Sequence, residues 1–448
     1  MSQEQIEAVL ARAEREGVAF VDLQFTDFLG NLKNCTIPSY RLREALLRGV
    51  WIDGSSIEGF ARIHESDMFL MPDPTTYALL PWRNSAEGGK VARLICDVYK
   101  PNHEPFEGDP RNILKRVLAE AQAMGFEYYT GPEVEFFLFP RDASGQIVLE
   151  SKGNGYYFNL VVDEAHAIKR EIISALSELG ICSESATYEV ANNQHEIDLH
   201  YDQALKTADN TITLKMAAKF IAFRHNFYAS FMPKPFYGIN GSAMHTHQSL
   251  WRDGVNAFYD PTNVYGLSQT ALQFLAGQLA YAREIAAVFA PTVNSYKRLT
   301  PGYEAPVYIC WARINRSALI RVPQVSRGYE EMATRLEIRS PDPSSNPYLT
   351  FAVLLKAGLE GIKQGLEAPK PVEEDVYGFD DARLQQYYIH KLPGSLEEAL
   401  HLMEQGTVVR QVMGEYTFQR YLEAKRQEWD AFRTHVTDWE LNRYLEVL

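Results

Sequence analysis

The chain has 448 residues, of which 46% are hydrophobic, and its 44 basic and 58 acidic side chains give a formal net charge of −14 at pH 7. This size and composition exceed what one compact domain usually buries, so we expect two domains. The negative charge repels nucleic-acid phosphates and anionic membranes over most of the surface, and we therefore expect neither nucleic acid nor a membrane as partner.

The N-terminal segment lacks a basic region followed by an apolar stretch, and no segment is long and apolar enough to cross a bilayer. The four cysteines lie far apart, without the spacing of a thiolate zinc site or the density of a disulfide framework. We therefore expect a soluble cytoplasmic protein with reduced cysteines.

The N-terminal part predicts a small mixed α/β domain. A helix over residues 2–16 is indicated by Ser2 and Gln5, which can form a capping box, and by Gly17, which can end the helix. The elements expected after it are strands over 18–25 and 90–98 and a helix over 39–49. A proline-rich loop follows, and we expect the domain boundary inside it, giving domains over 1–104 and 105–448.

The remaining chain alternates strand-like segments with long helical periodicities, which predicts an α/β or α+β domain. Asp109 and Pro110 form a good helix start, with the aspartate as N-cap and the proline at the first helical position. Long helices are expected over 164–180, 203–227, 268–289 and 347–364.

The segment 131–139 alternates as a β-strand does, which puts Glu133 and Glu135 on one face together with Phe137 and Phe139. Carboxylates buried unpaired among large apolar side chains are costly. A cation or arginine side chains are therefore expected beside these glutamates, and an exposed face of an edge strand is the alternative.

A second pair of glutamates follows from a predicted hairpin. Asn192 and Asn193 can serve as a two-residue loop because asparagine tolerates positive φ. In that register Glu189 lies directly opposite Glu196, a like-charge pair that destabilises a sheet unless something cationic lies between its members.

Two further strand patterns carry charge. His245 and His247 share one face of a probable strand after a glycine-rich turn, which raises the odds of a metal or phosphate site above those of a lone core histidine. Arg335, Glu337 and Arg339 stack on one face of another. Additional arginines in neighbouring segments are Arg298, Arg316 and Arg321.

This combination favours oxygen-rich coordination of Mg²⁺ or Mn²⁺ over zinc, because no cysteine ligands accompany the carboxylates. Arginines suit bidentate capture of phosphate and carboxylate, although a surface ion pair is the simpler explanation of any single arginine. Metal-binding carboxylates facing arginines are typical of phosphoryl transfer, even without a Walker-type loop.

Short motifs accompany these residues along essentially the whole chain: Asp53-Gly54-Ser55-Ser56, the segment 131–139, Gln194-His195-Glu196, Asn240-Gly241-Ser242, Asn294-Ser295-Tyr296-Lys297-Arg298, Pro301-Gly302-Tyr303-Glu304-Ala305-Pro306, Asn315-Arg316-Ser317 and Arg339-Ser340-Pro341-Asp342-Pro343. In this order they resemble glutamine synthetase of the prokaryotic type I class. The resemblance implies ATP-dependent ligation of ammonia to L-glutamate through γ-glutamyl phosphate. It also implies an α+β fold, in which a small β-grasp domain precedes a large catalytic domain with a curved antiparallel sheet, or partial barrel, flanked by helices.

Two sites for Mg²⁺ or Mn²⁺ are implied by the same resemblance. The ligands implied for the first, on the ammonia and glutamate side, are Glu135, Glu189 and Glu196. The ligands implied for the second, which orients the ATP phosphates, are Glu133, His245 and Glu337.

Substrate contacts are implied as well. Arg298 is expected to bind the α-carboxylate of glutamate, in a pocket also lined by Asn240 and Gly241. The residues implied to neutralise the transferred phosphoryl group and the nucleotide phosphates are Arg316, Arg335 and Arg339. Those implied near the nucleotide are Glu184, Tyr201, His247, Ser249 and Arg321.

Asp53 is implied to bind and deprotonate ammonium, with help from Ser56, Tyr157 and Glu189. Glu304 is implied to lie on a loop that closes over the acyl phosphate and shields it from water. Asp53 would serve the active site of the adjacent subunit, so the resemblance implies a ring-shaped homo-oligomer, a dodecamer of two stacked hexamers.

The chain departs from the family pattern at a few positions. Thr187 and Tyr188 stand where the family often has two histidines, and Ala243 replaces a usual glycine. Arg62 resembles a position of feedback inhibition by glutamine in the subclass that is not regulated by adenylylation, and no adenylylation is expected here.

Two other functions compete with this interpretation. A γ-glutamyl ligase for an organic amine such as a polyamine, ethanolamine or methylamine would share both metal sites, but Asp53, Tyr157 and Glu304 favour ammonium. A non-catalytic assembly or regulatory protein of the same fold is the second alternative, and the complete set of implied ligands argues against it.

Overall fold

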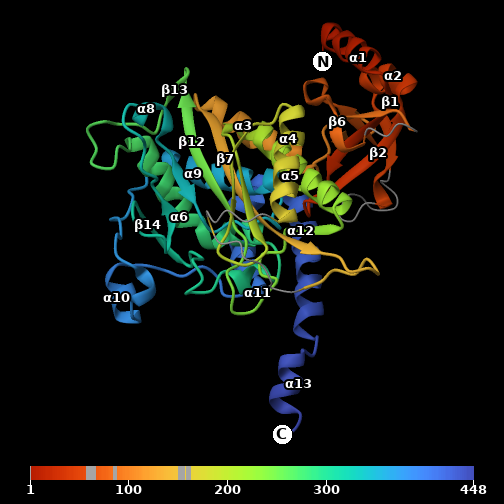
Figure 1. Cartoon of the computed structure of the whole chain (residues 1–448). Coiled ribbons are helices and arrows are strands. Elements are labelled where there is room, and N and C mark those ends of the chain that lie inside the picture. The colour runs from red at the N-terminus through yellow and green to blue at the C-terminus, as the bar shows by residue number, and fades with distance from the viewer. Residues whose placement is uncertain (1, 57–66, 84–87, 150–156, 158–162) are drawn as a thin grey trace.

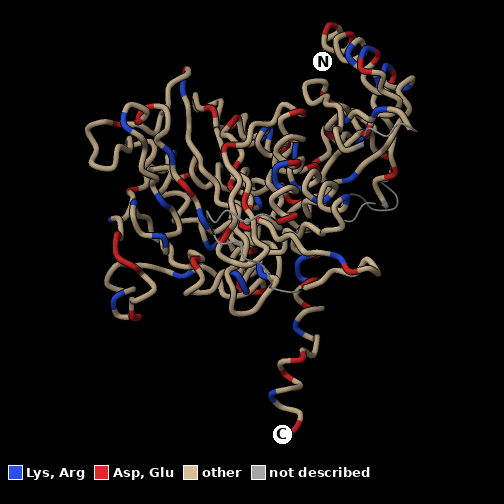
Figure 2. Tube along the Cα trace, in the orientation of Figure 1, with Lys and Arg blue, Asp and Glu red and all other residues tan. Residues whose placement is uncertain are grey.

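The computed structural model describes residues 2–56, 67–83, 88–149, 157 and 163–448. Figure 1 shows a small N-terminal part beside a larger body, with the C-terminal helix extending away from that body. Lysine and arginine positions intermingle with aspartate and glutamate positions along both parts of the trace (Figure 2).

The small part begins with α1 (Gln3–Glu16), which is capped as predicted: Ser2 and Gln5 form a capping box, and Gly17 ends the helix at a φ of 69°. The elements that follow are β1 (Val18–Thr26), β2 (Leu32–Pro38), η1 (Ser39–Arg41), α2 (Leu42–Arg48), β3 (Val50–Asp53), η2 (Gly54–Ser56), β4 (Asp67–Pro72), η4 (Pro74–Thr76), β5 (Ala78–Leu79), η5 (Pro81–Arg83) and β6 (Lys90–Tyr99). The sheet order is β2-β1-β6-β4-β3, with β1 and β6 parallel and the other pairs antiparallel. This arrangement agrees with the expected β-grasp domain.

The large part is also α+β, as expected. Its first elements are α3 (Pro110–Ala123), β7 (Glu127–Pro140), α4 (Glu164–Glu178), β8 (Ser183–Tyr188), β9 (Gln194–Leu199), β10 (Asp202–Gln203), α5 (Ala204–Arg224), β11 (Phe227–Ser230), β12 (Met244–Arg252), β13 (Val255–Asn256), α6 (Gln269–Phe289) and α7 (Ser295–Arg298). Those that follow are β14 (Tyr308–Ala312), β15 (Ala318–Arg321), α8 (Glu330–Ala333), β16 (Leu336–Ile338), α9 (Pro347–Gln364), η6 (Val376–Gly378), α10 (Asp381–Gln386), α11 (Leu396–Gln405), α12 (Val408–Arg433) and α13 (Asp438–Tyr444). The four long predicted helices are confirmed as α4, α5, α6 and α9.

The large sheet runs in the order β14-β15-β16-β12-β7-β9-β8, and its neighbours are antiparallel except for β14 and β15. One set of alternating side chains packs into the helical core: Leu336 and Ile338 lie in a cluster shared with α6 and α9, and Val134 and Phe136 in a cluster shared with α4 and α5. The period of two therefore turns the intervening charged residues toward the opposite face of the sheet.

The predicted hairpin register is wrong by two residues. Thr187, not Glu189, lies opposite Glu196. Glu189 belongs to a longer loop, where its N–H donates to the carbonyl of Gln194 at 3.0 Å, and Asn193 alone takes a positive φ. Because a shift of two preserves the face of every side chain, Glu189 still points to the same side as Glu196.

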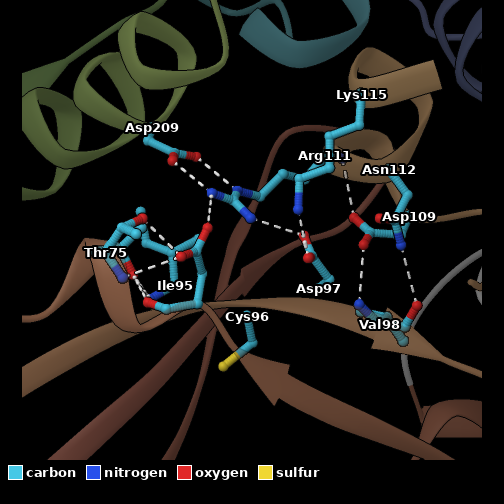
Figure 3. A network of polar contacts seen from close by, with 12 residues as sticks. Thr75, Ile95, Cys96, Asp97, Val98, Asp109, Arg111, Asn112, Lys115 and Asp209 are labelled. Carbon is cyan, nitrogen blue, oxygen red and sulfur yellow. Dashed lines mark hydrogen bonds and ion pairs between the residues drawn. The ribbon is translucent and has the colours of Figure 1, made fainter. Parts of the chain in front are cut away.

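Arg111, near the start of α3, joins the two parts through a buried polar network (Figure 3). Its guanidinium donates to Asp97 at 2.8 Å and to Asp73 at 2.9 Å in the small part. Two further bonds, of 3.0 and 2.9 Å, reach Asp209 on α5. Asp209 also accepts from the Tyr348 hydroxyl of α9 at 2.7 Å. The small domain is thereby held by three carboxylates around one guanidinium.

The loop between the parts follows the sequence expectation closely. Asp109 caps α3 and Pro110 occupies its first turn. Phe106, although it comes after the expected boundary, packs into the core of the small domain. We propose the boundary between residues 104 and 105, with the Phe106 side chain packing back across it.

No helix among the described residues combines the length and apolar character needed to span a bilayer.

Removing the Arg111 guanidinium should loosen the domain junction. We expect Arg111→Met to destabilise the protein by about 3–5 kcal/mol, because buried carboxylates would lose their counter-charge. Denaturant unfolding followed by circular dichroism measures this loss. The control is Arg43→Met, which removes an exposed bidentate ion pair with Glu7 and should change stability little. Equal effects of the two variants would show that burial of the network contributes nothing.

Candidate functional site

Two adjoining cavities open on the charged face of the large sheet. The larger cavity has a volume of about 430 Å³ and the smaller cavity about 270 Å³, and Glu133 and Asp198 line both. All six implied metal ligands line the larger cavity: Glu133, Glu135, Glu189, Glu196, His245 and Glu337. They come from β7, β9, β12, β16 and the β8–β9 loop, so only the fold brings them together.

Glu133 is one of two acids in the wall between the cavities, and two histidines of β12 contact its carboxylate. His245 Nδ1 lies 3.0 Å from one carboxylate oxygen and His247 Nε2 lies 2.7 Å from the other. Burial would raise the pKa of Glu133, but these hydrogen bonds outweigh it and hold the pKa well below its usual value. Ligand atoms of Glu133, Glu196 and His245 lie within 4.8 Å of one another, close enough to share a metal ion.

Three other acids of the larger cavity, Glu135, Glu189 and Glu196, are held with too little positive charge. Burial and the neighbouring Glu189 raise the pKa of Glu135 well above its usual value. Burial likewise raises the pKa of Glu189 to about 7, and burial together with Glu135 raises that of Glu196 to about 11. Gln194 orients Glu135 with a 2.9 Å hydrogen bond. A divalent cation is the counter-charge that this donor set fits, since its oxygen atoms are hard ligands.

Arginines form the opposite side of the larger cavity. Glu337 lies between Arg321 and Arg339, each 3.2 Å from one of its oxygens. Arg298 is buried, and the carbonyls of Ser340 and Arg339 orient it through bonds of 2.8 and 3.0 Å. Exposed Arg316 also lines this cavity, as do Asn240 and Gly241. An anionic substrate would therefore meet acids on one side and guanidinium groups on the other.

Most residues implied to lie near the nucleotide line the smaller cavity. Glu184, Tyr201, His247, Ser249 and Arg335 line it, whereas Arg321 lines the larger cavity instead. Arg335 donates to His247 Nδ1 at 3.1 Å, so His247 contacts Arg335 through one ring nitrogen and Glu133 through the other. This hydrogen-bonded chain connects the two cavities.

The residues implied for ammonium divide into two groups. Tyr157 and Glu304 line the larger cavity, and the Tyr157 hydroxyl donates to Glu304 at 3.3 Å. Glu304 has a positive φ of 56°, a strained backbone for a residue with a side chain. Asp53 ends β3 in the small domain and is exposed, and it does not line either cavity of its own chain.

Two other implied residues add little to this geometry. Ser56 ends η2, next to Asp53 in the small domain, and Arg62 lies outside the described residues. Of the departures from the family pattern, Thr187 and Ala243 line the larger cavity. The backbone N–H of Ala243 donates to Glu135 at 2.9 Å, so the added methyl leaves this contact intact.

Asp198 is a site residue that sequence reasoning missed. It lies opposite Glu133 in the β7–β9 register and accepts a hydrogen bond from the Ser185 hydroxyl. Burial raises the pKa of Asp198 to about 6. The signal was available, because Asp198 follows Glu196 by two residues and must share its face of the strand.

Comparison with known proteins covers the chain nearly end to end. The family model for the glutamine synthetase catalytic domain matches residues 107–444, and that for the glutamine synthetase β-grasp domain matches 17–101. Glutamine synthetase of Thermotoga maritima is 50% identical over 441 residues, which cover 98% of this chain and 99% of the relative. Glutamine synthetase of Methanosarcina mazei is 48% identical over 443 residues, which cover 99% of this chain and 98% of the relative.

Solved structures of similar fold also cover nearly the whole chain. Plasmodium falciparum glutamine synthetase superposes with a TM-score of 0.87 at 25% identity, covering 99% of both chains. A GmaS/ADP complex superposes with a TM-score of 0.86 at 30% identity, covering 98% of this chain and 99% of the other.

The raised carboxyl pKa values predict how metal binding depends on pH. Glu189 titrates near 4.5 when unfolded and near 7 in the folded, metal-free chain. Its contribution to stability is therefore present below pH 4.5 and is lost as pH rises toward 7. A cation must displace the bound proton, so the rise in melting temperature on adding Mg²⁺ should grow between about pH 6 and 8.

Thermal unfolding in EDTA and in excess Mg²⁺ measures this difference at each pH. The matched variant is Glu189→Gln, in which both the stabilisation by Mg²⁺ and its pH dependence should shrink. A stabilisation that is the same at every pH would contradict the assignment of Glu189 to the metal site.

Proposed function

Because the chain belongs to the glutamine synthetase family, we propose that its two cavities together form the active site of an ATP-dependent ligase that joins ammonia to L-glutamate. Its reaction is glutamate–ammonia ligation, which yields L-glutamine. The observation that carries the assignment is that all six implied metal ligands line one cavity, with the implied nucleotide residues beside it. Similarity to bacterial and archaeal enzymes agrees with the type I class.

The enzyme depends on a divalent cation, and we propose Mg²⁺ or Mn²⁺ at two positions. Glu135, Glu189 and Glu196 would hold one ion, and Glu133, His245 and Glu337 the other. The predominance of carboxylate oxygens supports these metals over zinc, and the closeness of Glu133, Glu196 and His245 supports a shared metal centre. When bound, the ions would neutralise phosphate charge and polarise the transferred phosphoryl group.

The smaller cavity is proposed to bind ATP, with Glu184, Tyr201, His247 and Ser249 around the nucleotide. The similar fold of the GmaS/ADP complex supports nucleotide binding. Arg321 is proposed to lie near the nucleotide from the side of the larger cavity. The residues proposed to neutralise the phosphates are Arg316, Arg335 and Arg339.

Glutamate is proposed to bind in the larger cavity. Arg298 would bind its α-carboxylate, beside Asn240 and Gly241. Two backbone carbonyls already orient the Arg298 guanidinium, and a guanidinium has five N–H donors, so donors remain for the substrate. Burial of Arg298 strengthens such a charge-assisted bond.

The reaction then proceeds in two balanced steps. The γ-carboxylate oxygen of glutamate attacks the γ-phosphorus of ATP, which forms γ-glutamyl phosphate and releases ADP. Ammonia next attacks the acyl carbon and displaces phosphate. We propose that Asp53, with Ser56, Tyr157 and Glu189, removes the proton of ammonium, and that Glu304 on its loop keeps water away from the acyl phosphate.

Asp53 is proposed to act in the site of an adjacent subunit. Its exposure at the end of β3, outside the lining of its own cavities, supports this.

We further propose two stacked hexameric rings. The C-terminal helix α13 extends from the body (Figure 1) and, with the residues after it, exposes Trp439, Leu445 and Val447 to 65%, 74% and 79%, which supports burial against another subunit. The cytoplasm, where ATP and glutamate are available, is the proposed compartment.

Activity with defined nitrogen donors tests the function. With ATP, Mg²⁺ and L-glutamate, we expect ammonium to drive phosphate release and glutamine formation, and putrescine, ethanolamine and methylamine to fail. Glu304→Gln and Asp53→Asn should lower glutamine formation by about 100-fold or more, because each removes a proposed proton-transfer or shielding carboxylate. Glu178→Gln, at an exposed site on α4, is the matched control.

The outcomes separate the alternatives. Turnover with an organic amine but not ammonium would indicate a γ-glutamyl amine ligase, which the names of the relatives do not favour. Absence of turnover with every nitrogen donor tested would indicate a non-catalytic protein. Co-assembly of Asp53→Asn with Glu304→Gln subunits should restore activity at about a quarter of the sites in a randomly mixed ring, if Asp53 serves its neighbour.

The C-terminal helix gives a separate test of assembly. Leu445→Asp combined with Val447→Asp should reduce the mass of the oligomer, because carboxylates cannot be buried in an apolar contact without a large cost. Light scattering after size-exclusion chromatography measures the mass. Phe223→Asp, at an exposed residue on α5, should leave it unchanged. An unaltered mass in the double variant would remove α13 from the proposed interface.

A further inference from the structure

Lys169, on α4, is a buried cation without an ordinary counter-ion. Its side chain is 4% exposed, and no carboxylate forms an ion pair with it in the described parts of the chain. Its ammonium nitrogen lies instead 3.6 Å from the centroid of the Tyr188 ring. A desolvated cation over an aromatic face is attracted by the negative face of the ring. Tyr188, together with the charge of nearby Asp163, thus makes burial of this cation tolerable.

Tyr188 is held from two further directions. Its hydroxyl donates to Asp163 at 2.5 Å, and Asp163 also caps the start of α4 by accepting from the His166 N–H at 2.9 Å. The His195 ring packs at 4.8 Å from the Tyr188 ring, and His195 is fully buried. The ring of Tyr188 therefore has very little freedom to move relative to α4.

This stack lies directly behind the metal-binding face. Tyr188 and His195 are partners in the β8–β9 register. Each is followed by a proposed metal ligand, Glu189 and Glu196, and both glutamates line the larger cavity. Glu196 alternates with His195 on β9, and Glu189 is bonded directly to Tyr188, the last residue of β8. A displacement of the Tyr188 and His195 rings therefore moves the two carboxylates next to them in the chain.

We propose that Lys169 is a positioning residue for the metal site: by holding Tyr188 against His195, it sets the distance between Glu189 and Glu196 so that both can bind one divalent cation. The inference rests on the proposed metal-binding role of those glutamates. Tyr188 is one of the two residues at which the chain departs from the family's common pair of histidines. The packing of Lys169 on Tyr188 is therefore specific to chains that carry this tyrosine.

A residue that only filled space here would be apolar. Methionine has nearly the length of lysine and would be buried without any desolvation of charge. Stability and metal affinity should consequently change in opposite directions on removing the charge, whereas a purely structural lysine would make them fall together. The second contact, between Tyr188 and Asp163, keeps the ring in the core after the charge is gone.

The test uses the full chain, stripped of metal, with Mn²⁺ binding measured by paramagnetic resonance and the melting temperature measured without metal. Lys169→Met should keep or raise the melting temperature, since a buried unpaired charge is removed. It should weaken Mn²⁺ binding about 10-fold, the effect expected for a residue that orients a metal ligand. Turnover at saturating metal should stay near the wild-type value. Lys169→Arg, which keeps a cation over the ring, should restore most of the affinity.

Two further variants complete the design. Tyr188→Leu removes the ring face and should weaken Mn²⁺ binding by a similar factor, and the double variant with Lys169→Met should add no further loss. Lys219→Met is the control: Lys219, an exposed lysine on α5, also lies over an aromatic ring, at 5.9 Å from Phe231, but outside this hairpin. Its Mn²⁺ binding should equal that of the wild type.

The outcomes distinguish the inference from the proposed function. Unchanged Mn²⁺ binding in Lys169→Met, with an active and metal-dependent wild type, would overturn the inference alone. Additive losses in the double variant, or a matching fall in stability and affinity, would also overturn it in favour of a structural role. A wild type without metal-dependent ligation would overturn the proposed function itself.

Discussion

Mutual repulsion among the glutamates on one face of the large sheet is the constraint around which the site is arranged. The fold sets these acids close together and partly removes them from water, so that burial raises the pKa of Glu135, Glu189 and Glu196. Hydrogen bonds from two histidines instead hold the pKa of Glu133 well below its usual value. Helices pack against the reverse face of these strands. Arg321 at the end of β15 and Arg339 just after β16 contact Glu337 on the charged face.

One histidine connects the residues of the two cavities. His247 contacts Glu133 with one nitrogen and Arg335 with the other, so a single imidazole joins the carboxylates to the guanidinium that faces the smaller cavity. A change of charge on either side is felt by the same ring. Asp198 lies in the wall between the cavities as well. Direct hydrogen bonds therefore link the proposed metal ligands to the cavity proposed for the nucleotide.

Local patterns in the sequence were sufficient for the long helices, for several strands and for the faces of their side chains. Capping residues located both ends of α1 and the start of α3, and the period of two assigned Glu133 and Glu135 to one face. The hairpin register failed because the loop before Gln194 makes its own hydrogen bonds, which loop chemistry alone did not indicate. The contact of Glu133 with both histidines is long-range, and so is the position of Glu337 between two arginines. Residue types cannot specify such pairings until the strands are ordered.

The Arg111 network has a consequence for how this architecture can evolve. Its carboxylates come from both domains, Asp73 and Asp97 from one and Asp209 from the other. A recombination event that exchanged the small domain for a foreign one would leave a buried guanidinium facing an unmatched surface. The two domains are thus inherited as a pair, and drift on one side of the junction is limited by what the other side presents.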